Sequence, residues 1–102
     1  KIDDFTKISD EPYYNPVLQR ETISFTSAET KEVVVNRPTE ELTLVIRNIK
    51  DCNINVYFES TTNIPPIVIL EPGQFFSIDL QRKVSKVVFV SDNYGSCEVT
   101  FW

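Results

Sequence analysis

The residue types that carry most enzyme chemistry are sparse in this sequence. The chain contains no histidine, so the commonest general base and the commonest metal ligand are both missing. Ser85 precedes Lys86, but neighbours in a strand point to opposite faces, so the pair does not form a nucleophile with its base. The same geometry separates the adjacent acids at 3–4, 10–11 and 40–41. The sequence predicts no catalytic residue and a chain that is not an enzyme.

Metal and phosphate sites are not indicated either. Asp3, Asp4, Asp10 and Glu11 offer oxygens of the kind that calcium binds. Their spacing is not that of a calcium-binding loop, so a solvated acidic segment is the better interpretation. Phosphate binding of the familiar kind needs a glycine-rich loop that opens a helix, and this chain has two glycines in all. We expect no metal and no cofactor.

Two cysteines, Cys52 and Cys97, lie too far apart in the chain to form a zinc-binding motif. Each cysteine occupies the same alternating positions as the apolar residues of its segment, which face the core in a strand. Both thiols are therefore expected to point inward. We favour two buried thiols, because buried cysteine behaves as a small hydrophobe. A disulfide stays open as the alternative, because parity does not fix the distance between the two residues.

Exposed aromatic side chains are the remaining candidates for a functional site. Six are expected on the outward parity of strands, in the N-terminal segment or in a loop: Tyr13, Tyr14, Tyr57, Phe75, Tyr94 and Trp102. Such residues anchor subunit interfaces, and carbohydrate-binding modules use them as platforms. A third interpretation is packing within the chain itself. We favour the subunit interface over the other two.

The elements that must position these residues are strands. Apolar and polar residues alternate with a period of two in segments that are rich in β-branched and aromatic residues, and turn signals separate the segments. The expected strands are 22–27, 31–36, 42–49, 53–60, 67–70, 74–80, 86–91 and 97–102. The inward parity predicts a core of Phe25, Leu44, Ile46, Ile54, Val56, Phe58, Phe76, Ile78, Phe89, Val99 and Phe101. The pattern predicts an all-β antiparallel β-sandwich, jelly-roll-like, with seven to eight strands over residues 21–102.

Residues 1–20 differ from the rest of the chain. They contain two prolines, four acidic residues and no sustained period, which is typical of an extended N-terminal arm. Apolar residues are spread among the acids, so we expect the arm to pack on its own domain or on a neighbouring subunit.

Length and charge exclude several classes of protein. The 102 residues are enough for one domain. The net charge is −5, and Lys and Arg are scattered apart from Arg82, Lys83 and Lys86, so nucleic acid and anionic membrane are not expected as partners. No apolar run approaches the roughly 18 residues that span a bilayer. The chain has no methionine, so we expect a piece of a longer protein or a processed product.

One resemblance extends over about residues 42–102. The segments VIRN (45–48), NVYFES (55–60), PIVILEPGQFFSIDL (66–80), KVVFVS (86–91) and EVTFW (98–102) resemble small β-sandwich domains that are accessory parts of tailed-phage virions. These domains serve as head decorations, head fibres or tail attachments. The shared order is an asparagine on one strand, Leu-x-Pro-Gly, an amphipathic strand, a strand into serine and a last strand ending in an aromatic residue.

This resemblance implies a role rather than a set of ligands. It implies attachment to other virion subunits and symmetric oligomerisation, often as a trimer, with residues 1–20 as an anchor. We therefore expect a non-enzymatic structural domain, of decoration or fibre type, that acts through protein–protein contacts in a virion or outside the cell. The alternative is a carbohydrate-binding or adhesion module that uses the exposed aromatics on a cell-surface glycan. An immunoglobulin-like domain fits less well, because the inner-strand tryptophan between bridging cysteines is missing.

Overall fold

The described part of the chain is built from strands and loops. The structure, a computed structural model, describes residues 17–62 and 64–102 and contains no helix in them. The strands are β1 (Gln19–Phe25), β2 (Thr30–Val34), β3 (Thr43–Lys50), β4 (Ile54–Phe58), β5 (Val68–Leu70), β6 (Phe75–Asp79), β7 (Lys86–Ser91) and β8 (Gly95–Phe101). They correspond one to one with the eight expected segments.

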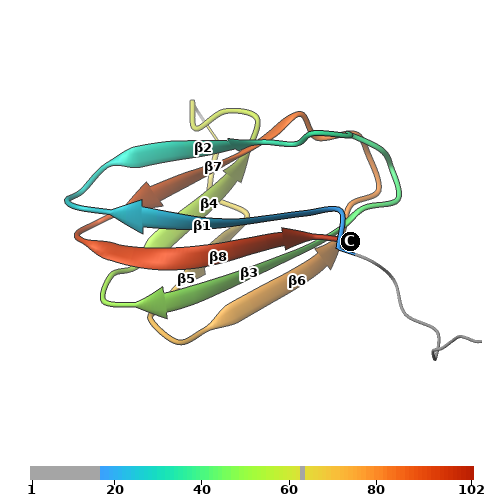
Figure 1. The fold of residues 1–102 in the computed structure, drawn as a ribbon. Helices are drawn as coiled ribbons and strands as arrows, with labels where there is room; N and C mark the ends of the chain where they lie inside the picture. Colours follow the sequence, from blue (N-terminus) through green and yellow to red (C-terminus); the bar gives the residue numbers. More distant parts are fainter. Residues whose placement is uncertain (1–16, 63) are drawn as a thin grey trace, which may run out of the picture.

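The strands form two antiparallel sheets of four that lie in two layers (Figure 1). We call them the β1 sheet, with strand order β1-β8-β3-β6, and the β2 sheet, with strand order β2-β7-β4-β5. Every connection except the β4–β5 hairpin crosses from one sheet to the other. The prediction of an all-β antiparallel sandwich is confirmed.

The core lies between the two sheets, where strand alternation sends every second side chain. Most of the predicted core residues are buried: Phe25, Leu44, Ile46, Ile54, Val56, Phe89, Val99 and Phe101. The other three, Phe58, Phe76 and Ile78, are half-buried and pack against this cluster. Phe76 and Ile78 stay partly exposed because β6 is the edge strand of its sheet.

The connection between β5 and β6 is a tight turn with a clear sequence cause. Gln74 N donates to Glu71 O at 3.0 Å, and Gly73 has a φ of 89°. Proline at the second position and a glycine of positive φ at the third are the signature of a type II turn. Pro72 therefore fixes φ at this corner, and Gly73 supplies the positive φ that follows.

The first strand begins earlier than the pattern predicted. β1 starts at Gln19, inside the segment expected to be an arm. Leu18 N also donates to Phe101 O at 2.9 Å, so main-chain pairing with β8 reaches back to Leu18. Residues 1–16, which make up the rest of the predicted arm, lie outside the described residues.

Both cysteines are buried free thiols that face the interior. Burial raises the pKa of Cys97 to about 12, and the nearby Cys52 adds to this shift. Burial also raises the pKa of Cys52, as does the charge of Asp92. Gly95 leaves room for this packing, because a Cβ there would lie 2.5 Å from both Cys52 Sγ and Lys50 O. The β3–β4 turn can therefore lie directly against the start of β8.

Candidate functional site

The aromatic residues predicted as a site lie on different surfaces. Tyr57 is half-buried on the outward face of β4, and Phe75 is 69% exposed on the outward face of β6, in the other sheet. Tyr94 is exposed just before β8, whereas Trp102 follows the far end of that strand. The structure brings none of these four residues together, so they form no common platform. The remaining two, Tyr13 and Tyr14, lie outside the described residues.

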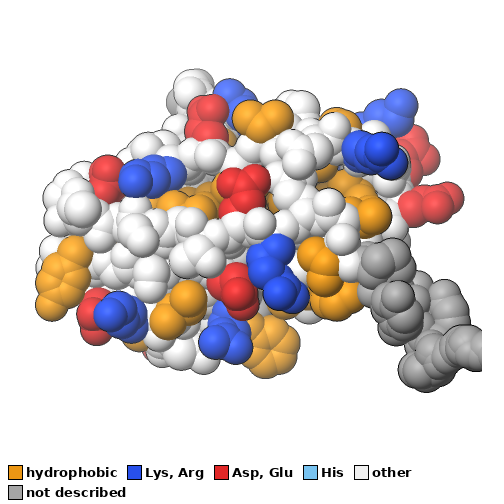
Figure 2. Space-filling model, in the orientation of Figure 1, with side chains coloured by type: hydrophobic (Ala, Val, Ile, Leu, Met, Phe, Trp, Pro, Cys, Tyr) orange, Lys and Arg blue, Asp and Glu red, His pale blue; other side chains and the backbone are white. Residues whose placement is uncertain are grey.

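The outward face of the β1 sheet carries charges of both signs. Strand register places Glu98 of β8 beside Arg47 of β3, and Arg47 beside Phe75 of β6. Arg20 and Asp79 occupy further outward positions of this sheet. Figure 2, which views this face, shows basic and acidic side chains interspersed with single hydrophobic ones. A face of this composition is compatible with full hydration, as expected for the outer side of a sandwich.

The outward face of the β2 sheet has a different composition. We define the β2-sheet face as the six apolar side chains that point outward from this sheet or from the residue before β5: Val34, Tyr57, Ile67, Ile69, Val88 and Val90. Val34 is 63% exposed and Ile69 is 54% exposed, at the two edges of the sheet. Apolar side chains this exposed at both edges are unusual on the solvent side of a sheet.

Strand register brings together the members of the β2-sheet face on β7, β4 and β5. Val88 of β7 lies opposite Tyr57 of β4, and Val90 lies opposite Asn55, which in turn pairs with Ile69 of β5. The central Val88 is buried, and Tyr57 and Val90 beside it are half-buried. These side chains therefore form one apolar group across β7, β4 and β5, whereas Val34 of β2 lies opposite Lys86.

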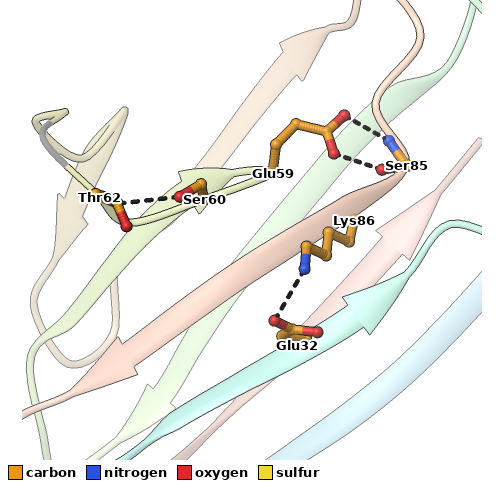
Figure 3. A network of polar contacts seen from close by, with 6 residues as sticks. All are labelled: Glu32, Glu59, Ser60, Thr62, Ser85 and Lys86. Atoms are coloured by element: carbon orange, nitrogen blue, oxygen red, sulfur yellow. Dashed lines mark hydrogen bonds and ion pairs between the residues drawn. The ribbon is translucent and has the colours of Figure 1, made fainter.

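Two charged side chains accompany this face. Glu32 of β2 and Lys86 of β7 form an ion pair of 3.2 Å between their side chains, drawn in Figure 3. Both are exposed, and exposed pairs of this kind contribute about 0–1 kcal/mol. They neutralise each other and leave the β2-sheet face without net charge at its outward strand positions.

Sequence reasoning found Tyr57 in this group and missed the aliphatic members. The signal is nevertheless present, because 33–35, 67–70 and 87–90 are continuous apolar runs instead of alternating ones. A strand without alternation places apolar side chains on both of its faces. The outward members of these runs make up the aliphatic part of the β2-sheet face.

A polar network ties the end of β4 to the loop before β7 (Figure 3). The carboxylate of Glu59 accepts a hydrogen bond from Ser85 N at 2.8 Å and another from the Ser85 hydroxyl. Ser60 N donates to Phe58 O at 2.8 Å across Glu59, whose φ is 69°, so Glu59 is the centre of a γ-turn. The backbone here is held in a left-handed conformation that non-glycine residues rarely adopt.

The chemistry of this serine–carboxylate pair is limited. The hydrogen bonds from Ser85 lower the pKa of Glu59 below its usual value. A carboxylate of lowered pKa is a weak base, so it is a poor acceptor for a serine proton in nucleophilic catalysis. The arrangement fits an anchor for the loop better than an activated serine.

Asn48 links three parts of the fold from inside the core. It is fully buried at the end of β3, and its amide donates to Cys52 O at 2.8 Å and to Leu70 O at 2.9 Å. Its carbonyl oxygen accepts a hydrogen bond from Gly73 N at 2.8 Å, and its backbone N–H donates to Gln74 O at 2.9 Å. The Oδ1 atom has no hydrogen-bond partner among the described residues. The asparagine and the Leu-x-Pro-Gly turn of the sequence motif therefore contact each other directly.

A groove lies at the end of the sandwich where β1 begins and β8 ends. It comprises two adjoining pockets of about 250 and 480 Å³ that share Leu18, Arg37 and Leu42. Trp102 lines the larger pocket, together with Thr39, Glu41 and Thr43. Gln19 lines the smaller one and is held there by hydrogen bonds to Val34 O and from Asn36 N. This groove is where Trp102 meets charged and hydroxyl side chains.

Two further observations apply to the described ranges, 17–62 and 64–102. They contain no group of three His, Cys, Asp or Glu side chains placed to hold a metal ion. Nor do they contain a helix long and apolar enough to span a membrane. In comparisons with known proteins, no protein-family model, no curated protein and no solved structure matches this chain.

Proposed function

We propose that this chain is a non-enzymatic assembly domain that binds other protein subunits through its β2-sheet face. The observation that carries the proposal is the contrast between the two outward faces. The β1-sheet face carries several charged side chains around the single exposed Phe75, whereas the β2-sheet face exposes Val34, Ile67 and Ile69 around half-buried Tyr57. Fully burying an exposed aliphatic side chain contributes about 1.5–3 kcal/mol, so a partner protein would gain affinity from covering this face.

The resemblance to virion accessory domains suggests which subunits these are. We propose partners within a tailed-phage virion, with this domain as a decoration or fibre-type component. The strand pairing supports a jelly-roll winding, which is common in capsid proteins. It is fully nested, because β4 pairs with β5, β3 with β6, β2 with β7 and β1 with β8. The trimer that the resemblance implies stays a prediction.

Site-specific photo-cross-linking tests this function. A photoreactive side chain replaces Ile69 on the β2-sheet face or, as a matched control, Phe75 on the opposite face, where exposure is greater. Irradiation in the particles or cells that contain the chain should give a discrete protein adduct from position 69 and none from position 75. Adducts from both positions, or from position 75 alone, would contradict the assignment of the face.

The groove beside Trp102 supports a second candidate, a carbohydrate-binding module. Its volume of about 480 Å³ lies in the range of small-ligand pockets. An indole ring beside Arg37, Thr39 and Glu41 is the combination of apolar platform and polar groups that sugars require. Titration with a panel of glycans should then change Trp102 fluorescence, and Trp102→Ala should abolish binding. If no glycan changes the fluorescence, this candidate is rejected while the assembly function stands.

A further inference from the structure

We infer that the groove beside Trp102 binds the preceding segment of its own chain, with either Tyr13 or Tyr14 seated against the indole ring. Neighbours in an extended chain point to opposite sides, so one of the two tyrosine rings faces the groove. This contact is separate from the β2-sheet face and does not depend on the proposed assembly function. A glycan that needs the same indole ring would have to displace the tyrosine.

The groove presents apolar surface for such a ring. Three of its lining residues, Val35, Leu42 and Phe101, are buried. Two more, Leu18 and Trp102, keep 53% and 38% of their surface exposed. Two aromatic rings in contact attract each other beyond the effect of the area that they bury. An aromatic side chain is therefore favoured over an aliphatic one beside Trp102.

Polar groups border this apolar surface. Arg37, Thr39 and Glu41 line the larger pocket together with Trp102. Tyrosine combines an apolar ring with a hydroxyl that both donates and accepts hydrogen bonds, so it suits a pocket of mixed composition. A guanidinium group is also attracted to the face of an aromatic ring. The lining of the groove thus matches tyrosine in both its apolar and its polar parts.

The chain enters the domain at this groove. The backbone N–H of Leu18 donates to Phe101 O at 2.9 Å, and the Leu18 side chain lines both pockets. Residues 1–16 therefore connect to the domain beside the groove and at no other place. Four residues of extended chain span about 13 Å, so Tyr14 is tethered within about that distance of Leu18, and Tyr13 lies one residue further along the chain.

The short tether selects the chain's own segment as the occupant. A short flexible linker gives the attached group an effective concentration in the mM range. In a solution of about 10 µM protein, the same segment of any other copy is present at roughly one hundredth of that concentration. Because the two segments have the same sequence, their intrinsic affinity is equal and the tethered one occupies the groove.

Acrylamide quenching of the full chain tests the inference, because Trp102 is the single tryptophan and its fluorescence reports on this groove. Wild type is compared with the double variant Tyr13→Ser/Tyr14→Ser. The control is Ile2→Ser/Phe5→Ser, which removes two apolar side chains from the same segment but outside the contact. The tyrosine variant should raise the quenching constant about two-fold, since an effective concentration in the mM range keeps even a weak contact at least half formed. The control should keep the wild-type constant.

Equal quenching constants in wild type and the tyrosine variant would overturn the inference, and so would an equal rise in both double variants. Quenching that weakens as the protein is concentrated from about 2 to about 100 µM, well below the effective concentration of the tether, would assign the groove to the segment of another copy. Nuclear Overhauser contacts between the Trp102 indole and a ring of Tyr13 or Tyr14 are expected as a second measurement, and their absence would contradict the contact. None of these outcomes alters the adduct predicted from position 69.

Discussion

At the scale of single residues, Asn48 does the most to connect separate parts of the fold. Its amide satisfies two buried carbonyls, that of Cys52 in the β3–β4 turn and that of Leu70 at the end of β5. Its main chain also holds Gly73 and Gln74, so one residue joins β3 to the β3–β4 and β5–β6 turns. A buried amide that pairs with main-chain groups in this way specifies the arrangement of both turns, because a carbonyl left unpaired in the core is costly.

We predict that Asn48→Ala lowers the free energy of unfolding by about 2–4 kcal/mol, because it leaves two buried carbonyls unpaired. Urea unfolding followed by Trp102 fluorescence measures the change. The control is Asn55→Ala, which removes the same amide from a half-buried position on the outward face of β4 and should cost much less. Equal unfolding midpoints for the two variants would contradict the role given to Asn48.

The Cys97 thiol predicts a loss of stability in alkali. Its pKa is about 12 in the folded protein and about 8.5 in an unfolded chain. The unfolded state therefore loses its proton first, and the folded state is destabilised as the pH rises between these two values. Unfolding free energies near pH 8 and near pH 11 should differ more in wild type than in Cys97→Ala, which has no proton to lose at this position. An equal pH dependence in both proteins would show that Cys97 does not contribute.

At the scale of elements, the alternating pattern predicted which segments become strands and which side chains face inward. It missed some boundaries, because main-chain pairing with a neighbour decides where a strand starts. Gly95 and Ser96 lie outside the expected strand 97–102, but they pair with Phe25 and Ser24 of β1 and so belong to β8. Parity within a strand also carries no information about which strands pair.

The predicted site illustrates that limit. Tyr57 and Phe75 have the same outward parity in sequence, yet they lie on opposite faces of the molecule because β4 and β6 belong to different sheets. The continuous apolar runs in the sequence indicate which residues of these strands point outward and are apolar. Predicting that these residues share one face also requires the strand order β2-β7-β4-β5, which the sequence pattern does not contain.

The two glycines should respond differently to alanine. In Gly95→Ala the new Cβ would meet Cys52 Sγ and Lys50 O at 2.5 Å, so the β3–β4 turn must move, at a cost of about 1–3 kcal/mol or more. In Gly73→Ala nothing lies within 4 Å of the Cβ, and the cost is about 1–2 kcal/mol from the φ of 89° alone.

Adding Cys52→Ala separates these two causes. It should recover part of the loss in Gly95→Ala, because Lys50 O still obstructs the Cβ, and it should recover none of the loss in Gly73→Ala. Thermal or urea unfolding of the four variants measures this coupling. If Cys52→Ala restores stability to neither glycine variant, the contact between the Cys52 side chain and the new Cβ at position 95 is not what destabilises Gly95→Ala.

At the scale of the whole molecule, the account depends on the difference between two outer surfaces of one sandwich. One carries several charged side chains, and the other has an apolar group across β7, β4 and β5, with the paired Glu32 and Lys86 between this group and Val34 of β2. The proposed function assigns contact with partner subunits to the second surface and solvent to the first.

Amide hydrogen exchange of the full chain, measured free and bound in the assembly that contains it, tests this claim most directly. The account predicts slower exchange in the assembly at Glu32, Tyr57, Ile69 and their neighbours in β2, β4, β5 and β7. Exchange at Arg47, Phe75 and Glu98 of the β1 sheet should stay unchanged. Slowing confined to the β1 sheet, or no slowing at any residue of the β2-sheet face, would contradict the account.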